Sequence, residues 1–303
     1  MGLFADRTPL GYETGSHRRW IAFFAAAIAA VVLLEPGSPS RGLCAMGWEP
    51  ASAQRRGQAT PPKAAQKAPQ PVPARRERPV PFAVGEKLTF DVSWSSYVTA
   101  GSATMTVLEK KPSYNSVAYY VVAEGRPGPL LSKLYDLYYK ADTLLDAYTL
   151  LPQRGSVFSK EGRRQRMKIT MFDHKTNTAS YEVQTRTNVK KDLRIPAYSQ
   201  DPLGAIYVLR ALALKAGDRF SVPICDAGET YKVDVAIGTP ETVRSGIGNV
   251  RAWKITPTLP KKQSSAARRL TLWLSDDARR LPVKMQAQLA VGTFDLTLRS
   301  VGK

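Results

Sequence analysis

The chain has few of the residues on which most catalytic and metal sites depend. Its 303 residues include two histidines and two cysteines. Acid–base catalysis most often uses histidine, and zinc sites need histidine, cysteine or carboxylate at ligand spacing. The sequence contains no cluster of that kind and no motif that identifies a reaction. We therefore predict no catalytic residue, no metal site and no cofactor.

The reactive residues that are present have simple structural interpretations. His174 lies in a predicted polar turn, where an exposed histidine is expected. Cys225 follows a predicted strand and is expected to be a small buried side chain. With Cys44 set aside, no intrachain disulfide can form. Asp276 and Asp277 are adjacent in a predicted turn and should point in different directions, which excludes a catalytic pair.

A long apolar run is also missing, but a short one lies near the start. Residues 20–34 are uncharged and mostly apolar, and they follow Arg18 and Arg19 directly. Such a run is too short for a typical membrane span and is typical of a secretory signal peptide. The best cleavage site, at residues 51–53, lies far from it, so residues 1–53 are interpreted as a signal peptide or a retained amino-terminal anchor.

Acidic residues are fewer than basic ones. The chain has 25 acidic and 44 basic residues, which gives a net charge of +19. In a nuclear or cytosolic protein this balance would suggest nucleic acid, but export excludes that partner. We expect a periplasmic protein, or one anchored in the inner membrane by Trp20–Leu34 with its domain facing the periplasm. The expected partners are anionic lipid, lipopolysaccharide or an envelope protein.

Residues 54–80 are rich in proline and basic residues, which predicts a disordered linker. The remaining residues, 81–303, are expected to form one domain. Apolar residues there alternate with polar ones, as in Leu88, Phe90, Val92 and Trp94, and turn-forming segments separate the runs. The pattern predicts an all-β antiparallel meander that forms a barrel, half-barrel or sandwich.

Two helical segments interrupt this pattern. Asp201 is a capping residue, Pro202 occupies the first helical position, and Gly217 follows the apolar run, so one packed helix is predicted near 202–213. A second, shorter helical turn is predicted over residues 130–134.

Basic and aromatic side chains provide the candidate binding residues. Arg164, Arg166 and Lys168 alternate along a predicted strand and should share one face. The second basic group is Lys261, Lys262, Arg268 and Arg269. These cations form either a solvated outer face or an anion-binding face for phosphate-bearing lipid. The candidate aromatic residues are Tyr135, Tyr138 and Tyr139. They either pack on the sheet or line an apolar ligand cavity.

Several stretches in a fixed order resemble the domain-of-unknown-function family 3108 of exported bacterial proteins. They are Val84–Phe90, Ala100-Gly101, Leu151-Pro152, Asp201-Pro202 with Tyr207, Leu209 and Arg210, and Leu272–Ser275 with Arg280–Val283. The resemblance covers most of residues 82–301. It implies an exported all-β protein and brings no catalytic residues.

The leading interpretation is a non-catalytic envelope module that binds an apolar or amphiphilic ligand, or an envelope partner. The alternatives are a carboxylate-dependent hydrolase of envelope material and a membrane-tethered scaffold. An apolar cavity would favour ligand binding, whereas a cleft with convergent buried carboxylates would favour hydrolysis.

Overall fold

The computed structural model describes residues 76–303 apart from 96–97, 135, 186–187, 261–266 and 290–291. Most of the leader and linker, together with Tyr135, Lys261 and Lys262, therefore lies outside the described residues. Residues from Glu77 to Lys303 fall in one compact unit. No helix in this described part is long and apolar enough to cross a membrane.

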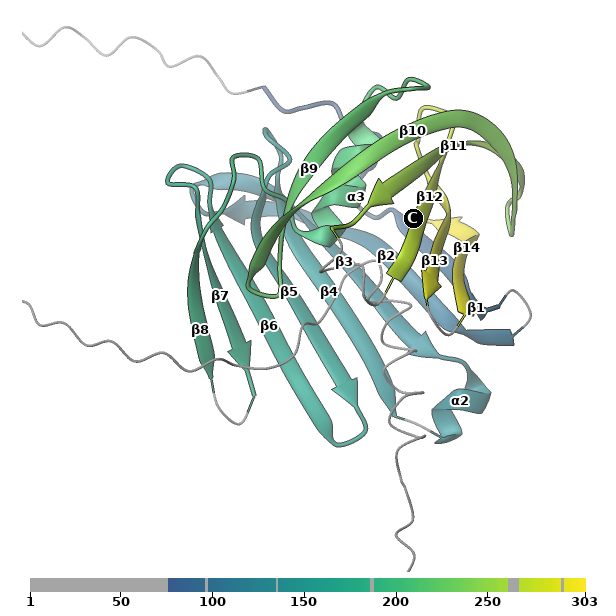
Figure 1. Cartoon of the computed structure of the whole chain (residues 1–303), viewed down its shortest axis with the longest axis horizontal. Coiled ribbons are helices and arrows are strands. Elements are labelled where there is room, and N and C mark those ends of the chain that lie inside the picture. Colours follow the sequence, from purple (N-terminus) through teal and green to yellow (C-terminus); the bar gives the residue numbers. More distant parts are fainter. Residues whose placement is uncertain (1–75, 96–97, 135, 186–187, 261–266, 290–291) are drawn as a thin grey trace, which may run out of the picture. The chain divides into compact units, whose positions relative to one another are not determined.

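The strands form one continuous antiparallel sheet that is not closed (Figure 1), which confirms the predicted all-β meander and identifies it as an open barrel. Its order is β8-β7-β6-β5-β4-β3-β2-β1-β14-β13-β12-β11-β10-β9. The bounds are β1 Lys87–Trp94, β2 Val98–Ser113, β3 Ser116–Pro127, β4 Leu137–Asp146, β5 Pro152–Glu161, β6 Arg164–Asp173, β7 Thr178–Gln184, β8 Val189–Arg194, β9 Arg219–Asp226, β10 Glu229–Ser245, β11 Gly248–Thr258, β12 Ala267–Ser275, β13 Pro282–Leu289 and β14 Gly292–Gly302.

The first and last strands are neighbours in this sheet. The register pairs Leu88 of β1 with Val301 of β14, and Trp94 with Phe294. All other ladders join strands that are consecutive in the chain. The β1–β14 pair is therefore the one ladder that unites the β1–β8 and β9–β14 halves of the described sheet.

Helix α3 (Pro202–Ala211) is the predicted packed helix. The Asp201 carboxylate caps it by accepting a hydrogen bond from the Gly204 amide at 2.9 Å, and proline is accommodated in the first turn because no helical donor is needed there. The helix ends two residues earlier than predicted. Gly217 does not cap the helix but lies in the turn before β9, with φ +89 and its amide donating to the Ile237 carbonyl.

The core lies between α3 and the sheet. Leu203, Ile206, Tyr207 and Leu209 of the helix are buried among apolar residues of β1–β4 and β10–β14. The amino-terminal end of α3 approaches β5 closely, since a Cβ added at Gly155 would lie 3.3 Å from the Asp201 Cβ. The short helix α2 (Pro129–Leu134), which was also predicted, contacts β2 and β3.

The two edge strands of the sheet, β8 and β9, do not pair with each other. A bridge, a hydrogen bond and apolar contacts hold this part of the fold together instead. Gln200, in the segment before α3, forms a parallel bridge with Ile224 of β9. The Lys191 ammonium group of β8 donates to the Gly228 carbonyl at 2.8 Å. Buried Ala179, Ile195 and Cys225 complete this seam.

Candidate functional site

The candidate site is the concave face of β5–β8, the face turned toward α3. Cross-strand partners share a face in an antiparallel sheet. The register pairs Val157 with Lys168, Lys168 with Val183, and Val183 with Val189. Lys168 lines a cavity together with Leu203 of α3, which identifies the face as concave. In this row of the concave face, one lysine therefore lies among three valines.

The first predicted basic group belongs to this face. Arg164, Arg166 and Lys168 have the same strand parity, so they share one face. Arg164 is exposed at the strand end, whereas Arg166 and Lys168 are half-buried. A solvated outer face was one of the two interpretations of these cations, but the register places them on the concave side.

Where α3 covers the face, only a small cavity remains. Its volume is about 30 Å³, enough for about one or two water molecules. Its polar lining includes Lys168, Tyr181, Asp201 and Asp226. The other side chains of this region fill the space between helix and sheet.

Three aspartates, Asp142, Asp201 and Asp226, line this cavity, and convergent buried carboxylates are the feature expected of a hydrolase. Asp201, however, uses both oxygens for structure: one accepts from the Gly204 amide, and the other accepts from the Thr143 hydroxyl at 2.7 Å. Burial raises the pKa of Asp201 to about 6. A cavity of about 30 Å³ cannot hold a glycan or peptide beside it, so the geometry does not support hydrolysis there.

Cys225 also lines the cavity, and 1% of its surface is exposed. Burial, reinforced by the nearby Asp226 carboxylate, raises the pKa of its thiol to about 12. A thiol with such a pKa carries almost no thiolate at neutral pH and is a poor nucleophile.

Away from α3, the same concave face is open. Val189 points to this side, opposite Val183, yet 56% of its surface is exposed. Val157, Val183 and Arg166 nearby are half-buried. An apolar residue on a concave face is normally covered, so the described residues leave this part of the face accessible.

A larger hollow, of about 440 Å³, lies at the opposite end of β6–β8. Its lining combines Phe172 and Ala179 of the concave face with Met171 and Ser180 of the other face. It therefore wraps around the end of the sheet, and we do not assign it to the site.

The predicted tyrosines do not line one cavity. Tyr138 and Tyr139 are adjacent on β4 and point to opposite faces. The Tyr138 hydroxyl donates to Glu124, and burial together with this bond raises its pKa to about 12. Tyr139 is buried on the concave side, and its hydroxyl donates to Glu161. Tyr135 lies outside the described residues.

Most of the second predicted basic group lies outside the residues that the structure describes. Lys261 and Lys262 fall in an undescribed segment, and only the strand position of Arg268 is described. Arg269, on β12, is exposed and pairs with Gln288 of β13. Of this group, therefore, only Arg269 is placed, and it lies on β12 and not on β5–β8.

The remaining reactive residues have structural partners. A ring nitrogen of His174 lies 2.8 Å from the Pro152 carbonyl oxygen, and the ring stacks on Phe172. No group of three or more potential metal ligands occurs among the described residues.

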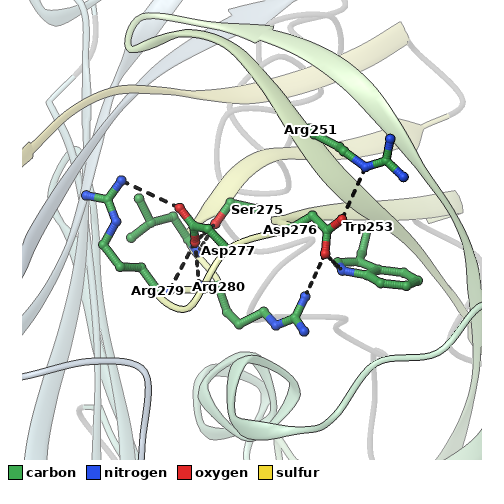
Figure 2. A network of polar contacts seen from close by, with 8 residues as sticks. Arg251, Trp253, Ser275, Asp276, Asp277, Arg279 and Arg280 are labelled. Atoms are coloured by element: carbon green, nitrogen blue, oxygen red, sulfur yellow. Dashed lines mark hydrogen bonds and ion pairs between the residues drawn. The ribbon is translucent and has the colours of Figure 1, made fainter.

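The two neighbouring aspartates face different partners (Figure 2). Asp276 accepts hydrogen bonds from the Trp253 indole at 2.6 Å and from Arg251 at 3.2 Å. Asp277 accepts from the Ser275 hydroxyl at 2.7 Å and from the Arg279 amide at 3.0 Å. They stabilise the β12–β13 turn and do not form a catalytic pair.

Lys191 and Val189 of β8 were not identified from the sequence as site residues. Their strand reads VKKDLR and has no alternation of apolar and polar residues. Their place on the concave face follows only from the pairing of β8 with β7, and the local sequence does not specify that pairing.

Solved structures similar to this chain share little sequence with it. A beta-barrel-like protein of domain of unknown function DUF1849 from Brucella abortus has a TM-score of 0.47 and 12% identity, covering 72% of this chain and 97% of that one. A Bacteroides fragilis protein described as exported, with a YmcC-like fold, has a TM-score of 0.30 and 11% identity, covering 75% and 100%. A Parabacteroides distasonis protein described as a lipoprotein has a TM-score of 0.28 and 11% identity, with the same coverage.

No curated protein matches the chain. The resemblance seen in the ordered sequence motifs is confirmed by a family model that matches residues 89–299, well over half of the chain. The chain therefore belongs to the family described as protein of unknown function DUF3108.

Proposed function

We propose that this protein is a non-catalytic module of the bacterial envelope that binds an anionic amphiphile on the concave face of β5–β8. The observation that carries the proposal is the exposure of Val189 on a face that also carries Arg166 and Lys168. An apolar surface flanked by cations suits a ligand with a hydrocarbon part and a phosphate or carboxylate.

The location in the envelope is part of the proposal. It is supported by the apolar run of residues 20–34 behind two arginines, a layout typical of exported proteins. The interior next to α3 is filled, so the ligand is expected to lie along the uncovered strands.

Native mass spectrometry of the protein purified from the cells that make it tests this proposal. We expect a bound lipid-sized mass that organic extraction removes. The variant Val189→Asp should lose it, because a charge would be placed on the apolar part of the face. The matched control is Val84→Asp, which changes another exposed valine (49% exposed) outside the site.

Equal retention by both variants would place the ligand elsewhere on the molecule. Absence of any bound amphiphile in the unmodified protein would overturn the proposal. Because both valines are largely exposed, neither substitution is expected to prevent folding.

A further inference from the structure

The end of the sheet opposite Arg210 of α3 forms a single rim. At this end, Trp94 of β1 pairs with Phe294 of β14 and with residue 98 of β2, and Leu137 of β4 pairs with Glu161 of β5. The same ladders bring the β5–β6 turn, helix α2 and the start of β12 to this end. We call it the open rim, and Figure 1 shows β4, β5 and β6 running to it beside α2.

Several elements present an exposed cation at the open rim. Arg163 and Arg164 lie at the β5–β6 turn, Lys133 lies on α2, and Arg269 lies on β12. None of the four forms an ion pair with an acid of the described part of the chain.

Two acids lie near the β5–β6 turn. Asp136 forms an ion pair with Lys160 at 2.6 Å, whereas Glu161 accepts from the neutral Tyr139 hydroxyl and keeps its own charge. The α3 end also has cations, but acids bind several of them: Asp276 binds Arg251, and Glu77 binds Lys110. The described part of the open rim therefore carries exposed cations, on three separate elements, that form no ion pair with its acids.

The rim is continuous with the candidate site. Arg164, Arg166 and Lys168 follow one another along the same face of β6, from the rim to the cavity beside α3. An anionic head group at the rim would meet a line of cations leading to the concave face.

We infer that the open rim docks on the surface of an anionic phospholipid bilayer, from which the amphiphile is taken up. This inference rests on the proposed function and identifies the source of its ligand. The cations come from three separate elements, so an array of phosphates suits them better than one small ion. Basic residues near such a surface contribute additively to its attraction.

Vesicle flotation tests the inference with the protein as its own cells process it. We expect binding to phosphatidylcholine vesicles that contain phosphatidylglycerol, weaker binding to phosphatidylcholine alone, and a decrease with salt. The variant R163Q/R164Q/R269Q should bind at least roughly tenfold more weakly. The control, K87Q/R194Q/R244Q, removes three exposed cations at the α3 end and should retain binding within about twofold, the range left for general charge effects.

Equal losses in the two variants would show that only net charge matters and would overturn the inference, as would binding without phosphatidylglycerol dependence. Inorganic phosphate at matched ionic strength should compete no better than chloride, whereas specific competition would indicate a single anion site instead. If flotation depends on the rim cations but the purified protein retains no amphiphile, the proposed function is contradicted and the docking inference stands. If the protein retains an amphiphile but flotation does not depend on the rim cations, the docking inference is contradicted and the proposed function stands.

Discussion

Arg210 of α3 and Glu86, just before β1, form a two-point ion pair across 124 residues of chain. The distances are 2.7 Å from Nη1 to Oε1 and 2.9 Å from Nη2 to Oε2. The Arg210 side chain has no exposed surface, and it also donates to the carbonyls of Arg279 and Arg280. Three of the stretches that carry the family resemblance therefore meet at one guanidinium, which fixes α3 inside the sheet.

We predict that Glu86→Ala will destabilise the protein strongly. It would leave a buried guanidinium without its counter-charge, which costs about 3 kcal/mol or more. Urea unfolding measures the effect. The exposed pair of Asp91 and Arg299 provides the control, because Asp91→Ala should cost less than about 1 kcal/mol. Similar losses in the two variants would contradict the assigned role of Glu86.

Asp201 should make stability depend on pH in the direction opposite to most aspartates. Burial raises its pKa from 3.8 to about 6, so the folded state binds the proton more tightly than the unfolded state. The resulting stabilisation is complete below about pH 4 and is lost as the pH rises through 6. The change over this range should be up to about 3 kcal/mol.

The variant Asp201→Asn isolates this contribution, because asparagine also caps helices. Urea unfolding from pH 4 to pH 7 should show the unmodified protein losing stability relative to the variant as the pH rises. A constant difference between the two curves would mean that the Asp201 carboxyl titrates at its ordinary pKa.

Gly228 should be intolerant of any side chain. A Cβ there would lie 2.7 Å from the Tyr181 ring, at φ +75. Gly228→Ala should therefore cost about 2 to 4 kcal/mol, from backbone strain and from overpacking at the seam. The control is Gly162→Ala, which has φ +58 and no atom within 4 Å. It should cost only the strain, about 1 kcal/mol, and thermal unfolding compares the two.

Cys225 should resist thiol reagents until the protein unfolds. Its surface is 1% exposed and its pKa is raised to about 12, so thiolate is scarce at pH 8. In a Cys44→Ser background, a disulfide reagent should label it at a rate that follows unfolding. Rapid labelling of the folded protein would show that the seam beside β9 opens readily.

Local sequence signals identified most of the strands that have one buried face, though not β11, and they identified α3 through Asp201 and Pro202. They did not identify β4, because residues 141–146 are buried on both sides and show no alternation. The charged β8 was also missed, as edge strands often carry lysine instead of an apolar pattern.

The candidate site was only partly visible in the sequence for a related reason. Alternation shows that Arg166 and Lys168 share a face, but it does not show which face is concave. That depends on the position of α3 and on pairings between distant segments, such as Gln200 with Ile224. The partnership of Glu86 and Arg210 likewise has no local signal.

The pairing of β1 with β14 has a consequence for the order of events in biosynthesis. A nascent chain that has reached Leu289 can pair β1 through β8, and β9 through β13, but no ladder yet joins the two groups. The final eleven-residue strand supplies that ladder. The continuous sheet therefore requires β14, and a truncation that removes this strand should leave two partial sheets without a ladder between them.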